Sequence, residues 1–421
     1  MALTREEAAA LDAQDPLARF RERFVAADPE LIYLDGNSLG RLPVDTRERL
    51  HDAVEQWGTE LVSGWHDWID APMRAGDALA TSVLGARPGE VIVADSTTVN
   101  LYKLACAALD AYSLSAQRAL VTDRDNFPTD RYVLEGIAQA RGLQLRLFDA
   151  ADPLHGPQPS DLEPILADGA VALIVLSHVN YRSGALADMR ALTELARRYD
   201  AHIVWDLSHS AGAVPVRLRE DGVELAVGCT YKYLNSGPGG TGYLYVAEEL
   251  QAGLRSPIWG WFGQAEQFAM ERDYTPAPGI ARFLAGTPPI LNLAAVEAAA
   301  AVTGEAGIGA LREKSVAQTE LLIALHDEWL APLGFELGTP RDPERRGSHV
   351  SLRHAEAWPI CRALIERAKV IPDFRGPDSI RLGVAPLYTS YVDLWDALDR
   401  LRGLVERGEQ REVEAARARV T

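Results

Sequence analysis

The 421-residue chain carries 60 acidic and 42 basic side chains, for a formal net charge of −18, and 47% of its residues are hydrophobic. This composition excludes a disordered or fibrous protein, because such chains hold too few apolar residues to form a core. An acidic surface repels phosphate backbones and anionic lipids, so neither nucleic acid nor a membrane surface is an expected partner.

The cysteines Cys106, Cys229 and Cys361 are odd in number and form no CxxC pair. A disulfide framework or a zinc site is therefore not expected, and a reducing compartment fits this usage. The N-terminal sequence is charged and lacks the continuous apolar region of a signal peptide. The most apolar stretches, 169–176 and 292–302, are too short to cross a bilayer or are interrupted by Glu297. We therefore expect a cytoplasmic protein.

The first predicted element is a helix that reaches about residue 24 and is followed by an exposed arm. Short runs rich in Val, Ile and Leu come next, and runs of this kind are typical of strands buried on both faces of a parallel sheet. Helical patterns separate most of them, which predicts an α/β domain. The predicted strands are 91–94, 119–122, 143–148, 171–177, 202–206 and 242–246, and the predicted helices are 98–112, 129–141 and 187–199.

The pattern changes after a proline-rich hinge at 287–289. Longer helical patterns and short strand-like segments predict a smaller α+β domain. Its expected elements are helices at 294–301, 310–329 and 391–406, and strands at 349–353 and 379–384. We expect three parts: an N-terminal helix and arm, 1–30, packed on the small domain; a large α/β domain, 31–290; and the small domain, 291–421.

Polar residues gather where the predicted strands end, at 95–98, 125–130, 177–180 and 206–209. Ligands bind outside the carboxyl ends of the strands in a doubly wound sheet. Several polar loops on one edge of the sheet therefore predict a binding site there.

Asp206 ends the apolar run His-Ile-Val-Trp-Asp. A carboxylate at such a position is costly unless a cation pairs with it. A protonated pyridinium nitrogen would be a suitable cation, and the pairing would keep a pyridoxal ring an electron sink. The alternative is that Asp206 only caps the helix that follows.

Lys232 lies in a glycine-rich segment between two predicted strands. A lysine in such a position can form a Schiff base with a carbonyl group once its amine has lost its proton. The alternative is an ordinary surface lysine beside a turn.

Three further features allow two interpretations each. Thr97 and Thr98 open a predicted helix, whose N–H groups can hold a phosphate or can simply be capped. Phe127 can stack on a flat ring or belong to the core. The aromatic segment 259–263 can be internal packing or can meet a ligand at a dimer interface.

Other common sites find no support in the sequence. His178 and His209 lack the spacing of metal ligands, so we expect no metal. No GxGxxG, GxxxxGK[ST] or GxSxG motif stands in the required context, which removes support for dinucleotide, P-loop and serine-hydrolase interpretations.

The combination of Asp206, His209, Tyr231 and Lys232 resembles fold-type I pyridoxal 5'-phosphate (PLP) enzymes of the class V aminotransferase group. Longer strings make the sequence similar to the kynureninase family from about Tyr33 to Tyr388. They are YLDGNSLG (33–40), DNFPTD (125–130), WDLSH (205–209), TYKYLNSGPGG (230–240), GWFG (260–263), GTPP (286–289) and IRLGVAPLY (380–388).

The resemblance implies a mainly parallel seven-stranded sheet with helices on both faces, and a homodimer whose sites lie at the subunit interface. It assigns catalysis to Lys232, Tyr231 and Asp206. Substrate binding falls to Arg381, which would hold the α-carboxylate, and to Trp65 and Ser38. The implied cofactor contacts are Thr97, Thr98, Phe127, Asp130, Ser177, Asp206, His209, Tyr231 and Lys232, with Trp261 and Thr287 supplied by the partner subunit.

The family reaction is the hydrolytic cleavage of the Cβ–Cγ bond of L-kynurenine to anthranilate and L-alanine, a step of tryptophan degradation. Lys232 would remove the α-proton, and Tyr231 would protonate the β-carbon. Trp65 and Thr287 depart from the animal members, which have histidine and asparagine there. This departure predicts a preference for kynurenine over 3-hydroxykynurenine.

Two alternatives stay open from the residues. A cysteine desulfurase or selenocysteine lyase would need a mobile nucleophilic cysteine on a late loop, and Cys361 lies in a helical pattern instead. A catalytically silent PLP-fold protein serving as a binding or regulatory module would be expected to lose Lys232, Asp206 or Arg381, and the sequence keeps all three.

Overall fold

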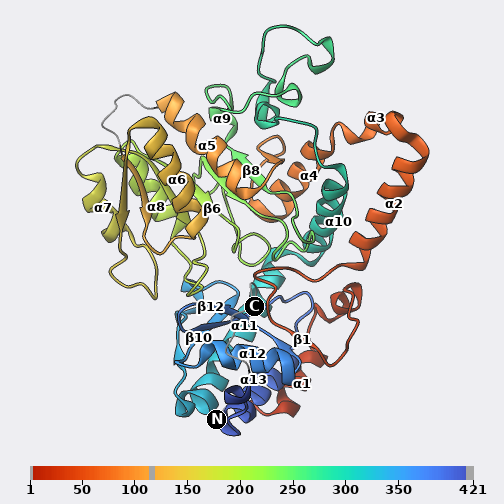
Figure 1. Cartoon of the computed structure of the whole chain (residues 1–421), viewed down its shortest axis with the longest axis vertical. Helices are drawn as coiled ribbons and strands as arrows, with labels where there is room; N and C mark the ends of the chain where they lie inside the picture. Colours follow the sequence, from red (N-terminus) through yellow and green to blue (C-terminus); the bar gives the residue numbers. More distant parts are fainter. Residues whose placement is uncertain (1–2, 113–118, 414–421) are drawn as a thin grey trace.

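The computed structural model describes residues 3–112 and 119–413 of the chain. Figure 1 shows a larger lobe built on one sheet and a smaller lobe that contains the N-terminal helix and the part of the chain from α11 (Ile308–Leu325) to the end of α13 (Tyr391–Glu406). The two lobes meet where the chain passes from helix α10 (Ile290–Ala306) into α11.

The sheet of the larger lobe has seven strands in the order β2-β8-β7-β6-β5-β3-β4. All are mutually parallel except β8, which runs antiparallel to both its neighbours. The predicted α/β class and the six predicted strands are confirmed, whereas β7 was missed. The strands are β2 (Val91–Val93), β3 (Ala119–Asp123), β4 (Gln144–Phe148), β5 (Val171–Ser177), β6 (His202–Asp206), β7 (Leu225–Gly228) and β8 (Tyr243–Val246).

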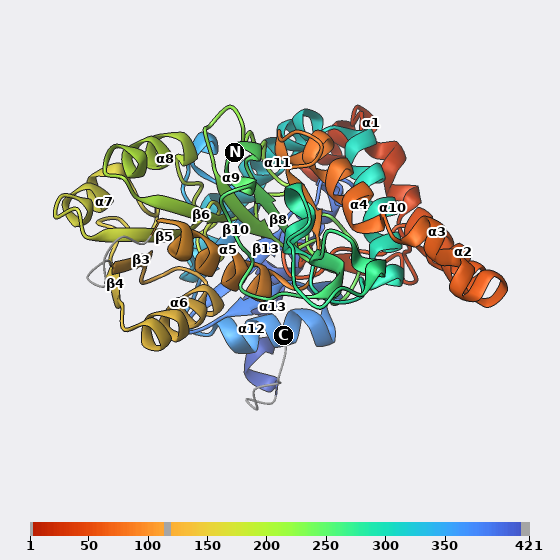
Figure 2. The same cartoon turned by 90° about the horizontal axis from the view of Figure 1, so that it is seen from above.

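Helices cover both faces of this sheet, as Figure 2 shows from above. Alternate residues along each strand enter two separate cores, because successive side chains of a strand point to opposite faces. Val204 of β6 packs with α5 (Thr97–Tyr112) and α6 (Pro128–Arg141). Its neighbours Ile203 and Trp205 pack on the other side, against helices that include α4 (Ala71–Leu79), α8 (Met189–Arg198) and α10.

The smaller lobe contains a four-stranded antiparallel sheet in the order β12-β13-β10-β9. Helix α1 (Arg5–Ala13) packs against α13 in this lobe. It corresponds to the predicted N-terminal helix and ends before Pro16; a short 3-10 helix, Ala18–Arg23, follows it. The elements are β9 (Glu336–Leu337), β10 (His349–Arg353), β12 (Asp373–Arg375), β13 (Ser379–Gly383), α11, α12 (Ala357–Arg367) and α13 (Tyr391–Glu406).

Two other parts connect the lobes or project from them. The short strand β1 (Ile32–Tyr33) pairs in parallel with β11 (Val370–Ile371) and attaches the N-terminal arm to the smaller lobe. Helix α2 (Val44–Glu60) packs along α10.

Within the described residues, no single helix is long and apolar enough to span a membrane. The helix α10 and the segment 308–333 reach the required length and composition only when taken together, and the two are bent by 74° relative to each other.

Candidate active site

A cavity of about 290 Å³ lies at the carboxyl ends of the large-sheet strands. Ser177 and Asp206 are the last residues of β5 and β6, and Lys232 follows β7. Nine of the predicted cofactor residues line this cavity: Thr97, Thr98, Phe127, Asp130, Ser177, Asp206, His209, Tyr231 and Lys232. Thr129, Val179, Tyr181 and Ser208 also line it. None of the four was assigned a cofactor contact, although all except Tyr181 lie in the loops predicted to form the site.

Two buried carboxyl groups, Asp206 and Asp130, lie together in this cavity. Asp206 accepts a hydrogen bond of 2.8 Å from the backbone N–H of Ser208, which fixes its orientation at the end of β6. Burial, followed by the charge of Asp206, raises the pKa of Asp130 well above its ordinary value. Among the described residues, the buried Oδ2 of Asp130 has no hydrogen-bond partner. The pair therefore suits a ligand that brings a positively charged N–H group.

Lys232 reaches the same cavity from the loop after β7. Its Nζ lies 3.0 Å from Nε2 of His209 and 5.8 Å from the ring centroid of Phe127. Burial lowers the pKa of His209 well below its ordinary value, and the nearby charge of Lys232 lowers it further. His209 is therefore neutral near pH 7, and its Nε2 can accept a hydrogen bond from the lysine amine.

One end of the cavity is formed by the turn that leads from β2 into α5. The Oγ of Ser96 accepts a hydrogen bond of 3.4 Å from the backbone N–H of Val99. Thr97 and Thr98, in the first turn of the helix, line the cavity, and N–H groups at a helix N-terminus bind anions well. A Cβ on Gly242 would come within 2.8 Å of the Thr97 nitrogen, so only glycine fits beside this turn.

Tyr231 lines the cavity next to Lys232. Interaction with Cys229, followed by burial, raises the pKa of Tyr231 above its ordinary value. The phenol therefore keeps its proton at neutral pH and is able to donate it.

Arg381, the predicted carboxylate clamp, is 1% exposed and does not line the cavity itself. Its guanidinium binds Asp373 through Nε, at 2.6 Å, and through Nη2, and Nη2 also contacts Ser38 Oγ at 3.2 Å. Its Nη1 donates to the carbonyl of Tyr181, a residue of the cavity wall. The structure thus brings the predicted Ser38 and Arg381 together behind that wall.

Asp373 was not singled out in the sequence, although it is the main partner of Arg381. The two residues face each other across the antiparallel pair β12 and β13. Burial, followed by the charge of Asp373, raises the pKa of nearby Asp35 to about 7. No sequence motif predicts that Asp35 and Asp373 surround Arg381, because their proximity depends on strand register. The only signal in the sequence is that Asp373 and Arg381 have apolar neighbours in their strands, which is typical of buried charged residues.

The remaining predicted residues do not line the cavity of their own chain. Trp65 packs against Trp68 and Phe262, with ring centroids 5.8 and 5.7 Å apart. Trp261 is 39% exposed, and Thr287 is exposed just before α10. The backbone N–H of Phe262 donates to the carbonyl of Ala285 at 3.1 Å, so the two loops lie side by side.

The described residues contain no group of three or more His, Cys, Asp or Glu side chains placed to hold a metal ion.

The fold and the lysine–aspartate site together define the class of fold-type I PLP enzymes. Two solved structures share the fold: a cysteine desulfurase from Thermococcus onnurineus NA1 and a cystine C–S lyase with cysteine persulfide. The first is 19% identical with a TM-score of 0.77, covering 93% of this chain and 98% of its own. The second is 18% identical with a TM-score of 0.76, covering 89% and 98%.

Sequence comparison narrows the class. The kynureninase of Pseudomonas fluorescens is 45% identical over 96% of each chain. That of Burkholderia pseudomallei (strain 1106a) is 43% identical over 99% of this chain and 100% of its own. Residues 311–401 match the kynureninase C-terminal domain. The chain belongs to the kynureninase family.

Proposed function

We propose that this chain is a PLP enzyme that hydrolyses L-kynurenine to anthranilate and L-alanine, a step of tryptophan degradation. The observation that carries the proposal is the cavity in which Lys232, Asp206 and the turn at Thr97 and Thr98 converge. Relatives named kynureninase, similar over nearly the whole chain, support the choice of substrate.

The residues of the cavity fit PLP at its ring nitrogen, its phosphate, a face of its ring and its carbonyl carbon. Asp206, beside the buried and unpartnered Oδ2 of Asp130, suits a protonated ring nitrogen. Thr97, Thr98 and Tyr231 suit the phosphate, Phe127 suits a face of the ring, and Lys232 suits the carbonyl carbon. When bound, PLP supplies an electron sink for the bonding electrons at the substrate's Cα.

The protein's own residues then handle protons and orientation. Arg381, held by Asp373, is the group proposed to bind the substrate α-carboxylate, because a guanidinium fork matches a carboxylate. Lys232, within hydrogen-bond distance of neutral His209, removes the proton from the substrate's Cα. Water adds to the γ-carbonyl; its oxygen remains in anthranilate. Tyr231, which keeps its proton at neutral pH, protonates the β-carbon that becomes the methyl group of alanine.

We also propose that the protein is a cytoplasmic homodimer; the exposed loops at Trp261 and Thr287 support the dimer. A single chain leaves Trp261 exposed, together with Trp259 and Phe268 on the same loop. Exposed apolar clusters of this kind favour contact with another protein surface. In the proposed dimer these loops complete the site of the partner subunit.

The reaction is tested by mixing the purified protein with PLP and L-kynurenine and following anthranilate fluorescence. We expect anthranilate and L-alanine in equal amounts. Cofactor binding without anthranilate would leave the fold assignment intact and would refute the substrate. Persulfide release from cysteine is not expected, because Cys361 is fully buried inside α12 and burial raises the pKa of its thiol to about 12.

The surroundings of Trp65 support a preference for kynurenine over 3-hydroxykynurenine. Trp65 does not line the cavity of its own chain. It packs among Trp68 and Phe262, and Phe262 contacts Trp261, so the aromatic surface that it would bring to a site completed in the proposed dimer offers a substrate hydroxyl little hydrogen bonding. We expect kcat/KM to favour kynurenine by about 10- to 100-fold, since a hydrophobic pocket discriminates only modestly against an added hydroxyl. The double variant Trp65→His/Thr287→Asn should narrow this ratio. A higher value for the hydroxylated substrate in the wild type would refute the proposal.

A further inference from the structure

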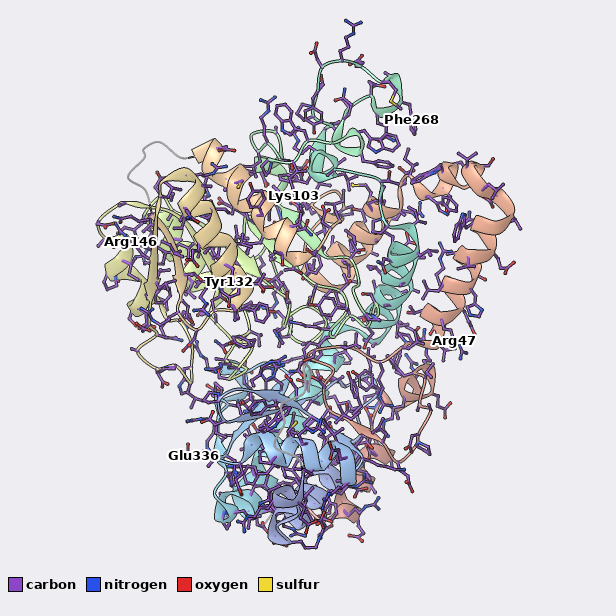
Figure 3. The ribbon with its side chains drawn as sticks, in the orientation of Figure 1. Arg47, Lys103, Tyr132, Arg146, Phe268 and Glu336 are labelled. Carbon is purple, nitrogen blue, oxygen red and sulfur yellow. The ribbon has the colours of Figure 1, made fainter. Side chains whose placement is uncertain are left out.

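Lys103 is a fully buried lysine in α5 that the proposed mechanism does not use. It is 0% exposed and lies within the larger lobe, as Figure 3 shows. Its Nζ donates to the carboxylate of Asp95 and to the backbone carbonyl of Phe283, the latter at 2.7 Å. A buried ammonium is costly and persists only where such partners compensate it. The two partners belong to two different segments of the larger lobe.

The first partner, Asp95, begins the turn that leads to Thr97 and Thr98. Its φ of 48° lies in the left-handed region, which aspartate tolerates better than most residues. Its carbonyl accepts a hydrogen bond of 2.7 Å from the N–H of Gly242, so the residue that precedes strand β8 fixes its backbone. Lys103 fixes its side chain. The direction of the N–H groups after Asp95 is thus set from two sides.

The second partner, Phe283, belongs to the segment that ends at Thr287. Ala285 of that segment accepts a hydrogen bond from Phe262, next to Trp261. A Cβ on Gly260 would come within 2.2 Å of the Ala285 carbonyl oxygen, so the two segments are in close contact. Lys103 therefore joins the phosphate-binding turn to the segments that carry Trp261 and Thr287.

We propose that Lys103 is a positioning residue for the cofactor phosphate: its ammonium holds the turn 95–98 against the segment 283–287. The inference rests on the proposed function only in taking PLP as the ligand of the cavity. The expected effect is specific to phosphate, because Lys103 acts on the turn at Thr97 and Thr98; within the described part of the chain its Nζ binds Asp95 and Phe283, not Lys232 or Asp206. Loss of the Lys103 ammonium should weaken phosphate binding by the turn 95–98 and leave the residues around the pyridine ring unchanged.

The test titrates the full-length apoprotein with PLP and, separately, with pyridoxal, which lacks the phosphate. Both ligands can form a Schiff base with Lys232, so visible absorbance follows both. We expect Lys103→Met to raise the Kd for PLP about tenfold or more, the effect of losing one charge-assisted hydrogen bond in the turn. The Kd for pyridoxal should stay within about twofold of the wild type, because pyridoxal has no phosphate that could contact the turn.

Lys314 in α11 provides a matched control. It is also buried, and its Nζ also binds one carboxylate, Asp15 at 2.8 Å, and one backbone carbonyl, Pro386 at 2.6 Å. Lys314→Met should lower stability in a comparable way and leave the ratio of the two dissociation constants unchanged. An equal loss of PLP and pyridoxal binding in Lys103→Met, or the same change of ratio in Lys314→Met, would overturn the proposal.

A second variant covers the case in which Lys103→Met fails to fold. Asp95→Asn removes the other charge of the pair, and asparagine also tolerates the left-handed backbone. It should produce the same selective loss of PLP binding, and unchanged binding of both ligands would overturn the proposal. These titrations contain no kynurenine, so a failure of the proposed reaction and a failure of this inference are separate results.

Discussion

Replacement of Lys232 by alanine is expected to lower kcat for anthranilate formation by at least ~10³-fold, within the range for loss of a catalytic base. Lys232 provides the only amine among the cavity-lining side chains, and its Nζ lies 3.0 Å from His209. Neutral His209 cannot replace it as a Schiff-base partner, because an imidazole forms no such bond. Stopped assays with fluorescence detection of anthranilate measure the loss.

Lys369→Ala is the control for this variant. Lys369 lies on the surface of the smaller lobe, where it binds Asp28 at 3.1 Å and Glu30 at 2.7 Å. Its replacement should leave kcat unchanged. A small primary amine added to Lys232→Ala should restore part of the rate, because it supplies the missing base. A Lys232→Ala enzyme that retains more than about a tenth of the wild-type kcat would contradict the assignment of Lys232 as the base.

The parts of the site that the sequence predicted share a physical origin. Asp206 and Ser177 end long apolar runs, and parallel strands bring such ends to one edge of the sheet. Phe127 and Asp130 follow β3 at the same edge. For these residues, proximity in space follows from position relative to a strand, which a single sequence displays. The family strings then added roles that position alone left open.

Other parts depend on contacts between segments distant in sequence. Asp373 meets Arg381 only through the register of β12 and β13, and the partners of Lys103 include a residue 180 positions away. Strand β7 is short and ends in Gly228, so its pattern was too weak to be recognised. Lys103 did leave a signal, since it is a lone lysine in an otherwise apolar stretch of α5.

The expected contribution of a partner subunit is a different case. Trp261 and Thr287 lie away from the cavity of their own chain. The roles proposed for them require a dimer, in which each chain would supply part of its partner's site. The prediction that they act in the partner's site therefore stays a prediction, which the size of the protein in solution and mixed-variant dimers would test.

Asp206→Asn is expected to lower kcat by about 10²- to 10³-fold, the usual effect of removing one preorganised electrostatic partner. Asparagine has the same shape and still accepts the hydrogen bond that Ser208 donates at 2.8 Å. It lacks the negative charge that, in the proposed function, would keep the ring nitrogen of PLP protonated, so the ring would withdraw electrons less strongly. Removal of the Cα proton should then limit the rate, and kynurenine deuterated at Cα should show a larger kinetic isotope effect.

The same variant should not lose stability at neutral pH. Burial and the charge of Asp206 raise the pKa of Asp130 in the folded apoprotein. A carboxyl group whose pKa is raised by folding destabilises the folded state as pH rises from its unfolded pKa through its folded pKa. Asp206→Asn removes one cause of that rise, so the apoprotein should unfold at an equal or higher temperature at pH 7, although its activity falls.

Asp123 offers the matched control for Asp206. It also ends a parallel strand, β3, is 5% exposed, and accepts a backbone hydrogen bond from the residue two positions on, at 3.0 Å. It does not line the cavity. Asp123→Asn should therefore keep kcat and the isotope effect of the wild type. If both variants lost activity equally, strand-end carboxylates would matter only for folding; loss in Asp206→Asn alone, with retained stability, would assign the charge of Asp206 to the chemistry.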